Sequence, residues 1–181
     1  TGIYTANMPV FYTALTPDTP LNSGCTAAVI AIDVHDNTAG NDNSITKLLV
    51  TFAGGPSFNQ FDIAALGNTI GSGVMLYQDL NGNGAWDATD QFLAPSAVPT
   101  WGFPNRVTLT YSNRWVPETV TGDSFFVVIR TSTSIQTGDT FTVGIASEDF
   151  EFTGGEKTEK AVTTGTITSN ADYDSPTANI V

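Results

Sequence analysis

The feature that most constrains the fold is a series of short segments rich in Val, Ile, Thr, Phe and Tyr, separated by Gly, Pro, Asn and Asp. Such segments favour β-strands, and the residues between them favour turns. The nearly continuous apolar run at 125–129 is typical of a central strand covered on both faces. This pattern predicts an all-β protein with a jelly-roll-like β-sandwich fold. We expect strands at 27–36, 45–53, 73–78, 106–111, 124–131, 140–146 and 161–168.

The N-terminal segment has its own pattern. We expect an extended strand and a Pro-rich tether over 1–20, followed by a single β-sandwich domain over 21–181. Every second residue from Tyr4 to Ala14 is apolar or aromatic and alternates with residues that are mostly polar or small, which is the period of a strand with one buried face. This strand can pair with its own sheet, or it can add to the sheet of a neighbouring subunit. Its candidate residues are Ile3, Tyr4, Ala6, Met8, Val10 and Tyr12.

The segment 79–90 carries side-chain oxygens at positions 1, 3, 5, 9 and 12 of a loop, with Gly84 at position 6. This is the oxygen spacing of a calcium loop, in which the chain winds tightly around a hard cation. Strand-like sequences flank it, so we expect a calcium-binding loop between strands, or alternatively an Asn/Gly-rich turn that binds nothing. The candidate ligands are Asp79, Asn81, Asn83, the backbone carbonyl of Ala85, Asp87 and Asp90.

A second acidic loop lies at 33–43, where Asp36 and Asp42 are further candidate cation ligands. Its spacing matches no fixed template, so an ordinary solvated loop explains it equally well. The acidic cluster at 148–151 is interpreted as a charged strand edge that prevents aggregation, with a cation site across an interface as the alternative.

The strongly acidic composition limits the classes of molecule that this protein is expected to bind. Six basic residues stand against 18 acidic ones, which gives a formal net charge of −12. Nucleic acid is an unsuitable partner because phosphate binding needs a basic face. Divalent cations suit this charge, and identical subunits repel one another until cations screen them. No apolar run approaches the length of a membrane helix, so no membrane insertion is expected.

The lone Cys25 excludes an intramolecular disulfide and is expected to be a small buried residue. The chain begins at Thr1, as expected of a mature protein after signal-peptide removal or of a trimmed chain. Together with the largely uncharged polar composition, this favours an extracellular or cell-surface location.

No catalytic activity is expected from the sequence. His35 is the only histidine and lies in no catalytic motif, and nothing brings Glu118, Glu148 or Glu151 into a pair suited to glycoside hydrolysis. Three tryptophans offer an alternative function, because aromatic faces pack against sugar rings: Trp86, Trp101 and Trp115. Within the calcium loop, Trp86 is interpreted instead as an anchor that pins the loop to the core.

Three segments resemble the subunits of archaeal cannulae, the hollow extracellular tubes of hyperthermophilic archaea. They are the Thr-Gly start with its aromatic-rich extended segment, VMLYQDLNGNGAWD at 74–87 and SFFVVIRTS at 124–132. The resemblance implies a jelly-roll subunit that polymerises without a chaperone, donates an extended terminal strand (here 2–15) and uses calcium to bridge subunits. The family's calcium ligands would fall on Asp79, Asn81, Asn83, Asp87 and Asp90, with the Asp at position 12 as a departure from Glu.

These observations predict a structural subunit that self-assembles with identical subunits into an extracellular tube or filament, by donor-strand exchange and Ca²⁺ coordination. The camelysin-like biofilm matrix proteins, a related strand-donating fibre family, fit the same pattern. The alternative function is a calcium-dependent carbohydrate-binding β-sandwich module.

Overall fold

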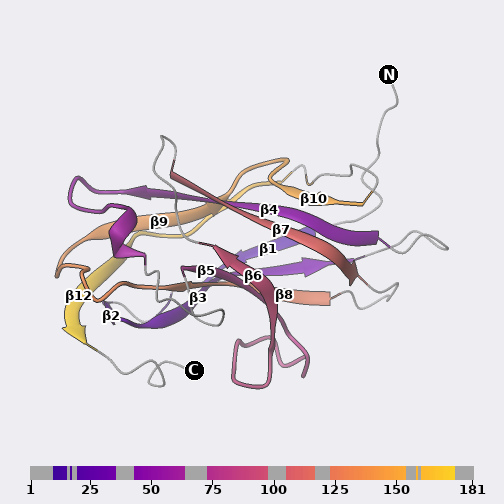
Figure 1. Ribbon diagram of the computed structural model, residues 1–181, viewed down its shortest axis with the longest axis horizontal. Coiled ribbons are helices and arrows are strands. Elements are labelled where there is room, and N and C mark those ends of the chain that lie inside the picture. Colours follow the sequence, from indigo (N-terminus) through magenta and orange to yellow (C-terminus); the bar gives the residue numbers. More distant parts are fainter. Residues whose placement is uncertain are drawn as a thin grey trace.

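The strands that the sequence predicts form two β-sheets. The structure is a computed structural model, and it describes residues 10–15, 17, 20–35, 43–63, 73–97, 105–116, 123–153, 158 and 160–173. In Figure 1 most strands of the two sheets run roughly horizontally, whereas β12 turns steeply downward at the left. Among the described residues the only helical element is one 3-10 turn, η1 (Gln60–Asp62), and no helix is long and apolar enough to cross a membrane.

The first sheet has five strands in the order β1-β3-β8-β5-β6, and all of its neighbours are antiparallel. Its strands are β1 (Val10–Ala14), β3 (Thr26–Val34), β5 (Val74–Gln78), β6 (Gln91–Ala97) and β8 (Asp123–Arg130). β8 lies at the centre, and its residues from Phe125 to Ile129 are all buried. This burial on both faces confirms what the continuous apolar run predicted.

The second sheet follows the order β10-β4-β9-β12-β2, with β7 paired to β4 and β11 paired to β9. β12 and β2 are parallel, and the other pairs are antiparallel. Its strands are β2 (Leu21–Ser23), β4 (Asn43–Gly54), β7 (Asn105–Val116), β9 (Thr140–Ile145), β10 (Phe150–Phe152), β11 (Val162–Thr163) and β12 (Ile167–Tyr173). The segment 161–168, expected as one strand, is divided between β11 and β12.

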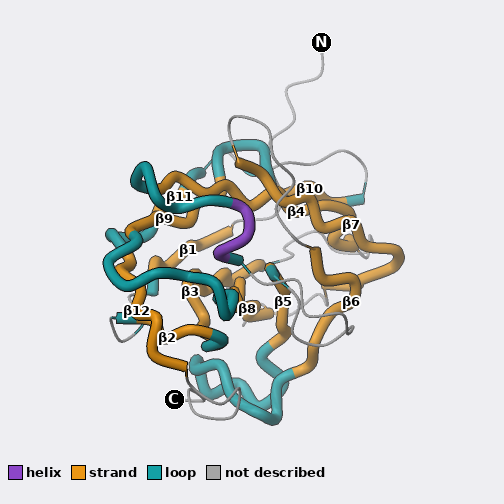
Figure 2. Tube along the Cα trace, turned by 60° about the vertical axis from the view of Figure 1, so that its left-hand side comes forward, coloured by secondary structure: helices purple, strands orange, loops and turns teal. Residues whose placement is uncertain are grey.

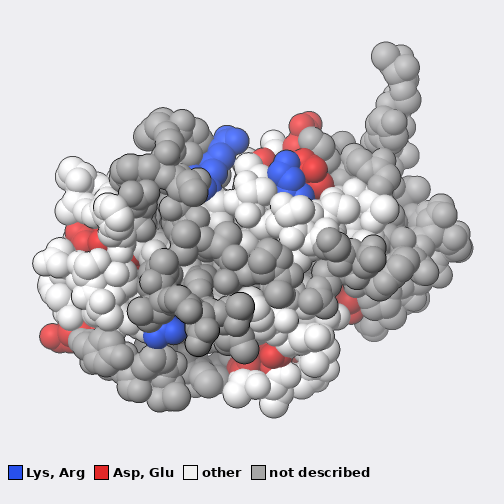
Figure 3. Space-filling model, in the orientation of Figure 1, with Lys and Arg blue, Asp and Glu red and all other residues white. Residues whose placement is uncertain are grey.

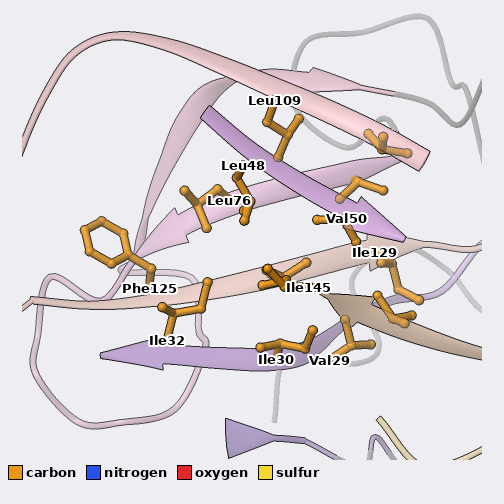
Figure 4. Packing of buried hydrophobic residues seen from close by; sticks show 14 of the residues in the cluster. Val29, Ile30, Ile32, Leu48, Val50, Leu76, Leu109, Phe125, Ile129 and Ile145 are labelled. Atoms are coloured by element: carbon orange, nitrogen blue, oxygen red, sulfur yellow. The ribbon is translucent and has the colours of Figure 1, made fainter. Parts of the chain in front are cut away.

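The core lies between the two sheets. Ile32 and Phe125 extend from the first sheet toward Leu48 and Val50 of the second, and all four side chains are buried (Figure 4). Successive residues of a strand point to opposite faces of its sheet, so every second side chain of these strands faces the core between the sheets. The two packed sheets confirm the all-β sandwich.

A smaller apolar cluster covers the other face of the first sheet. Met75, Phe126 and Val128 are buried there and contact the partly buried Tyr77 and Trp86. β5 and β8 therefore carry apolar side chains on both faces, and the second cluster lies next to the loop that joins β5 to β6.

Candidate metal centre

The candidate metal centre is the loop between β5 and β6, which projects beyond the strands (Figures 1 and 2). Strands flank it on both sides, as the sequence predicted. The loop begins at Asp79, whose N–H donates a hydrogen bond of 2.9 Å to the carbonyl of Ser124 at the start of β8. A central strand of the sheet thus fixes the first candidate ligand.

One carboxylate organises the first turn of the loop. Asp79 Oδ1 accepts the N–H of Gly82 at 2.7 Å, and Asp79 Oδ2 accepts the N–H of Gly84 at 2.9 Å. Both glycines have positive φ, 65° and 73°, which L side chains rarely adopt. The glycines therefore allow the chain to wind around Asp79.

Two further candidate ligands, Asn81 and Asn83, both contact Asp87. Asn81 Nδ2 and Asn83 Nδ2 donate to Asp87 Oδ2 at 2.9 and 2.8 Å. Their Oδ1 atoms accept backbone N–H groups, Asn81 from Asn83 at 3.0 Å and Asn83 from Ala85 at 2.7 Å, and each oxygen keeps a second lone pair. The hydroxyl and N–H of Thr89 donate to Asp87 Oδ1, and with the two amides they hold the pKa of Asp87 far below its usual range.

Asp90 closes the loop from its buried side. Its side chain is only 9% exposed, and Oδ2 accepts the N–H of Asp87 at 2.8 Å. Burial raises the pKa of Asp90 above its ordinary value against the effect of that hydrogen bond, and the negative charges of Asp79 and Asp87 raise it further. The other oxygen, Oδ1, is buried and forms no hydrogen bond with any residue that the structure describes, although the backbone of Leu80 lies close enough to lower the pKa of Asp90.

These observations fit a cation with oxygen ligands. The charges of Asp79 and Asp87 both act on Asp90, and one buried oxygen of Asp90 lacks a hydrogen-bond donor among the described residues, which is costly unless a positive charge satisfies it. Within the described ranges no group of three or more His, Cys, Asp or Glu side chains is arranged to hold a metal by itself. The amides of Asn81 and Asn83 and the carbonyl of Ala85 would therefore have to complete the ligand set, as the spacing predicts.

Trp86 anchors the loop to the outer apolar cluster. Its ring meets Tyr77 of β5 edge-on at 5.6 Å between centroids, and Tyr77 contacts Phe92 of β6 at 5.6 Å. The sequence indicated an anchor to the core, and the contact is made with the smaller apolar cluster on the outer face of the first sheet. The partly buried position also makes Trp86 a poor sugar platform.

Of the residues predicted for the N-terminal strand, two lie in a strand that the structure describes. Val10 and Tyr12 lie in β1, where β1 pairs with β3 of its own chain, Val10 opposite Val34 and Tyr12 opposite Ile32. Val10 is buried, and Tyr12 donates a hydrogen bond of 3.0 Å to Thr158. Outside the described residues lie Ile3, Tyr4, Ala6, Met8, Asp36, Asp42, Trp101 and Glu118.

The acidic cluster at 148–151 lies at the start of β10. Glu151 forms an ion pair of 2.9 Å with Lys47 on the neighbouring strand β4. Glu148 has a positive φ of 67°, in the turn before the strand. Cys25 is buried, as expected, and His35 contacts Phe11 edge-on at 5.5 Å.

Two buried carboxylates were missed by the sequence reasoning. Asp62 is 3% exposed and accepts the N–H of Asn59 at 2.6 Å, while Asp139 is 2% exposed and accepts the N–H of Gln136 at 3.0 Å. Both side chains cap turns. Burial raises the pKa of Asp62, with a smaller contribution from the charge of Asp139. An Asn-x-x-Asp spacing at 59–62 was the available signal for the first of them.

Comparison with known proteins assigns no family. No family model matches the sequence, and no curated protein matches it significantly. A solved structure described as "AvmM Catalyzes Macrocyclization in Alchivemycin A Biosynthesis" is similar at 9% sequence identity and a TM-score of 0.41, covering 94% of this chain and 92% of that chain. The resemblance to cannula subunits therefore stays a prediction.

This comparison corrects one expectation. The sequence predicted a protein without enzymatic activity, but the similar structure belongs to a protein described as a catalyst, so we withdraw that prediction. At this level of similarity the match also carries no activity over to this chain.

Proposed function

We propose that this protein is a calcium-binding β-sandwich subunit that assembles with identical copies into an extracellular tube or filament. The observation that supports this most is the β5–β6 loop, where the charges of Asp79 and Asp87 act on the buried Asp90, whose Oδ1 has no hydrogen-bond partner among the described residues. Bound calcium would supply positive charge there. Asp79, Asp87 and Asp90 would hold it together with the side chains of Asn81 and Asn83 and the carbonyl of Ala85.

The N-terminal strand supports the assembly part of the proposal. Among the strands that the structure describes, β1 lies at the edge of the first sheet and pairs with β3 alone. In the sequence, residues 15–20 separate β1 from β2 and include Pro17 and Pro20. A strand held at an edge and followed by a Pro-containing connection is suited to exchange, because β1 from another copy can make the same main-chain hydrogen bonds to β3.

The net charge connects calcium binding with assembly in this proposal. At −12, identical copies repel one another, and this repulsion opposes any homopolymer at low ionic strength. Calcium held in the loop lowers the negative charge of each copy, so assembly is expected to depend on calcium.

Sedimentation followed by electron microscopy tests this function. The full chain is incubated with calcium or with a chelator, beside a variant that lacks residues 1–14. We expect ordered filaments or tubes only from the full chain with calcium. The shortened variant should stay in solution and bind an added peptide of residues 2–15, because that peptide restores the edge strand.

A matched pair of substitutions provides the control if the shortened chain does not fold. Val10→Asp places a charge at a buried position of β1 and should abolish assembly, whereas Phe11→Asp changes its neighbour, which is 47% exposed, and should not. Full-length chains that remain monomers both with calcium and with chelator would contradict the proposal. Sugar binding that is lost on chelation would then favour the carbohydrate-binding alternative.

A further inference from the structure

The β5–β6 loop contains two Asn-Gly pairs, in which the asparagine side chain can react with the backbone of the following glycine. Asn81-Gly82 and Asn83-Gly84 are the only two Asn-Gly pairs in the chain, and all four residues are exposed. In such a pair the backbone nitrogen of the glycine can attack the side-chain amide carbon of the asparagine. Glycine favours this attack because it has no Cβ to hinder the approach.

The same loop restrains both attacking nitrogens. The N–H of Gly82 and the N–H of Gly84 are donated to the two oxygens of Asp79, at 2.7 and 2.9 Å. A hydrogen bond to a carboxylate is stronger than one to a neutral acceptor, and the negative charge opposes loss of the N–H proton. Attack requires that proton to leave, so a hydrogen bond of this kind opposes the reaction at both pairs.

We propose that Asn83 is a site of spontaneous deamidation in this protein, and that Asp79 restrains the reaction there and at Asn81. In the reaction the Gly84 nitrogen forms a bond to Asn83 Cγ, and the bond from Cγ to Nδ2 breaks. The Gly84 proton leaves with that nitrogen as ammonia. Water then opens the cyclic imide at either carbonyl, which yields aspartate or isoaspartate.

The hydrogen bonds of the two side-chain amides also indicate which asparagine deamidates faster. Asn81 Nδ2 donates to two acceptors, Asp87 Oδ2 at 2.9 Å and Thr89 Oγ1 at 2.6 Å. Asn83 Nδ2 donates to Asp87 Oδ2, at 2.8 Å. The amide of Asn81 is held more firmly and its glycine N–H bond is shorter, so Asn83 is the faster site.

Each product changes the loop differently. Aspartate at position 83 replaces a neutral amide oxygen with a carboxylate, and additional ligand charge tightens a calcium loop. Isoaspartate adds one carbon to the main chain where the loop turns, which displaces the following oxygens. The modification thus alters the site that the proposed function requires, although the reaction itself needs no calcium.

Peptide mapping by mass spectrometry tests the proposal on the full chain. The wild type, Asp79→Asn and Asp172→Asn are incubated at mildly alkaline pH with a chelator, so that failure of calcium binding cannot affect the result. Asp172 is exposed on β12, so Asp172→Asn makes the same charge change outside the loop. We expect conversion at Asn83 to precede conversion at Asn81, and to be roughly tenfold faster in Asp79→Asn than in either other chain.

A second comparison does not depend on the folding of Asp79→Asn. The wild type in urea loses the hydrogen bonds of the loop, so its Asn83 should convert faster than in the folded wild type. Equal rates in folded and unfolded chains, equal rates in wild type and a folded Asp79→Asn, or faster conversion at Asn81 would each overturn the proposal.

Discussion

At the scale of the residue, Gly84 determines whether the loop can close. Its φ is 73°, and a Cβ at this position would meet no atom within 4 Å. A side chain there would therefore strain the backbone without clashing with a neighbour. The N–H of Gly84 also reaches Asp79, so the strain falls directly on the candidate metal centre.

The variant Gly84→Ala should weaken calcium binding by roughly tenfold, because a left-handed conformation costs an L residue about 1–2 kcal/mol. Calorimetric titration measures the change. Gly165→Ala is the matched control, since a Cβ there also meets open space and Gly165 has no positive φ in the left-handed range. Equal affinities of the two variants would contradict this role of Gly84.

At the scale of the element, Tyr12 connects the edge strand β1 to a residue outside its own sheet. The Tyr12 hydroxyl donates to Thr158, which follows β10 in the chain, and so links β1 to residues beyond its own sheet. Burial raises the pKa of Tyr12 to about 12; the hydrogen bond to Thr158 opposes the rise, and the charge of Asp149 adds to it. The phenol is therefore stable in its neutral form where it lies.

This raised pKa predicts a loss of stability at alkaline pH. The pKa of Tyr12 is higher in the folded than in the unfolded chain, so its contribution is complete below about pH 10 and falls as the pH rises to about 12. The loss should approach roughly 2–3 kcal/mol. Urea unfolding across this range should show a steeper fall for the wild type than for Tyr12→Phe, and parallel curves would contradict the prediction.

The elements also show how far the sequence could predict the fold. The buried central strand β8 followed from its apolar run, because composition alone marks a strand covered on both faces. The strands β2, β10 and β11 have three, three and two residues, too few to show a period. The parallel pairing of β12 with β2 joins residues far apart in sequence, which no local pattern records.

For the candidate metal centre, too, the sequence could predict some features and not others. Local spacing predicted the turn at Gly84, because a loop of this kind is built from near neighbours, and the ligand positions from Asp79 to Asp90 stay a prediction. It could not predict the burial of Asp90 or its unpartnered Oδ1, which depend on how the loop packs. The double role of Asp79, whose two oxygens bind two glycine N–H groups, was likewise visible only in the structure.

At the scale of the whole molecule, the net negative charge would oppose the proposed association of identical copies. On the face in Figure 3 most of the described surface is neither acidic nor basic, and acidic side chains lie at several separate places around it. With six basic residues against 18 acidic ones, few of these charges can be neutralised within the chain. A cation that binds the loop therefore acts both on its local carboxylates and on the repulsion between copies.

The central claim is that this loop binds calcium, and calorimetric titration of the full chain with Ca²⁺ tests it most directly. The wild type should bind calcium, and Asp90→Asn should bind at least roughly tenfold more weakly, because it removes the charge of the buried ligand without changing its shape. Asp172→Asn should match the wild type. Indistinguishable titrations of the wild type and Asp90→Asn, or no heat of binding in the wild type, would contradict the account.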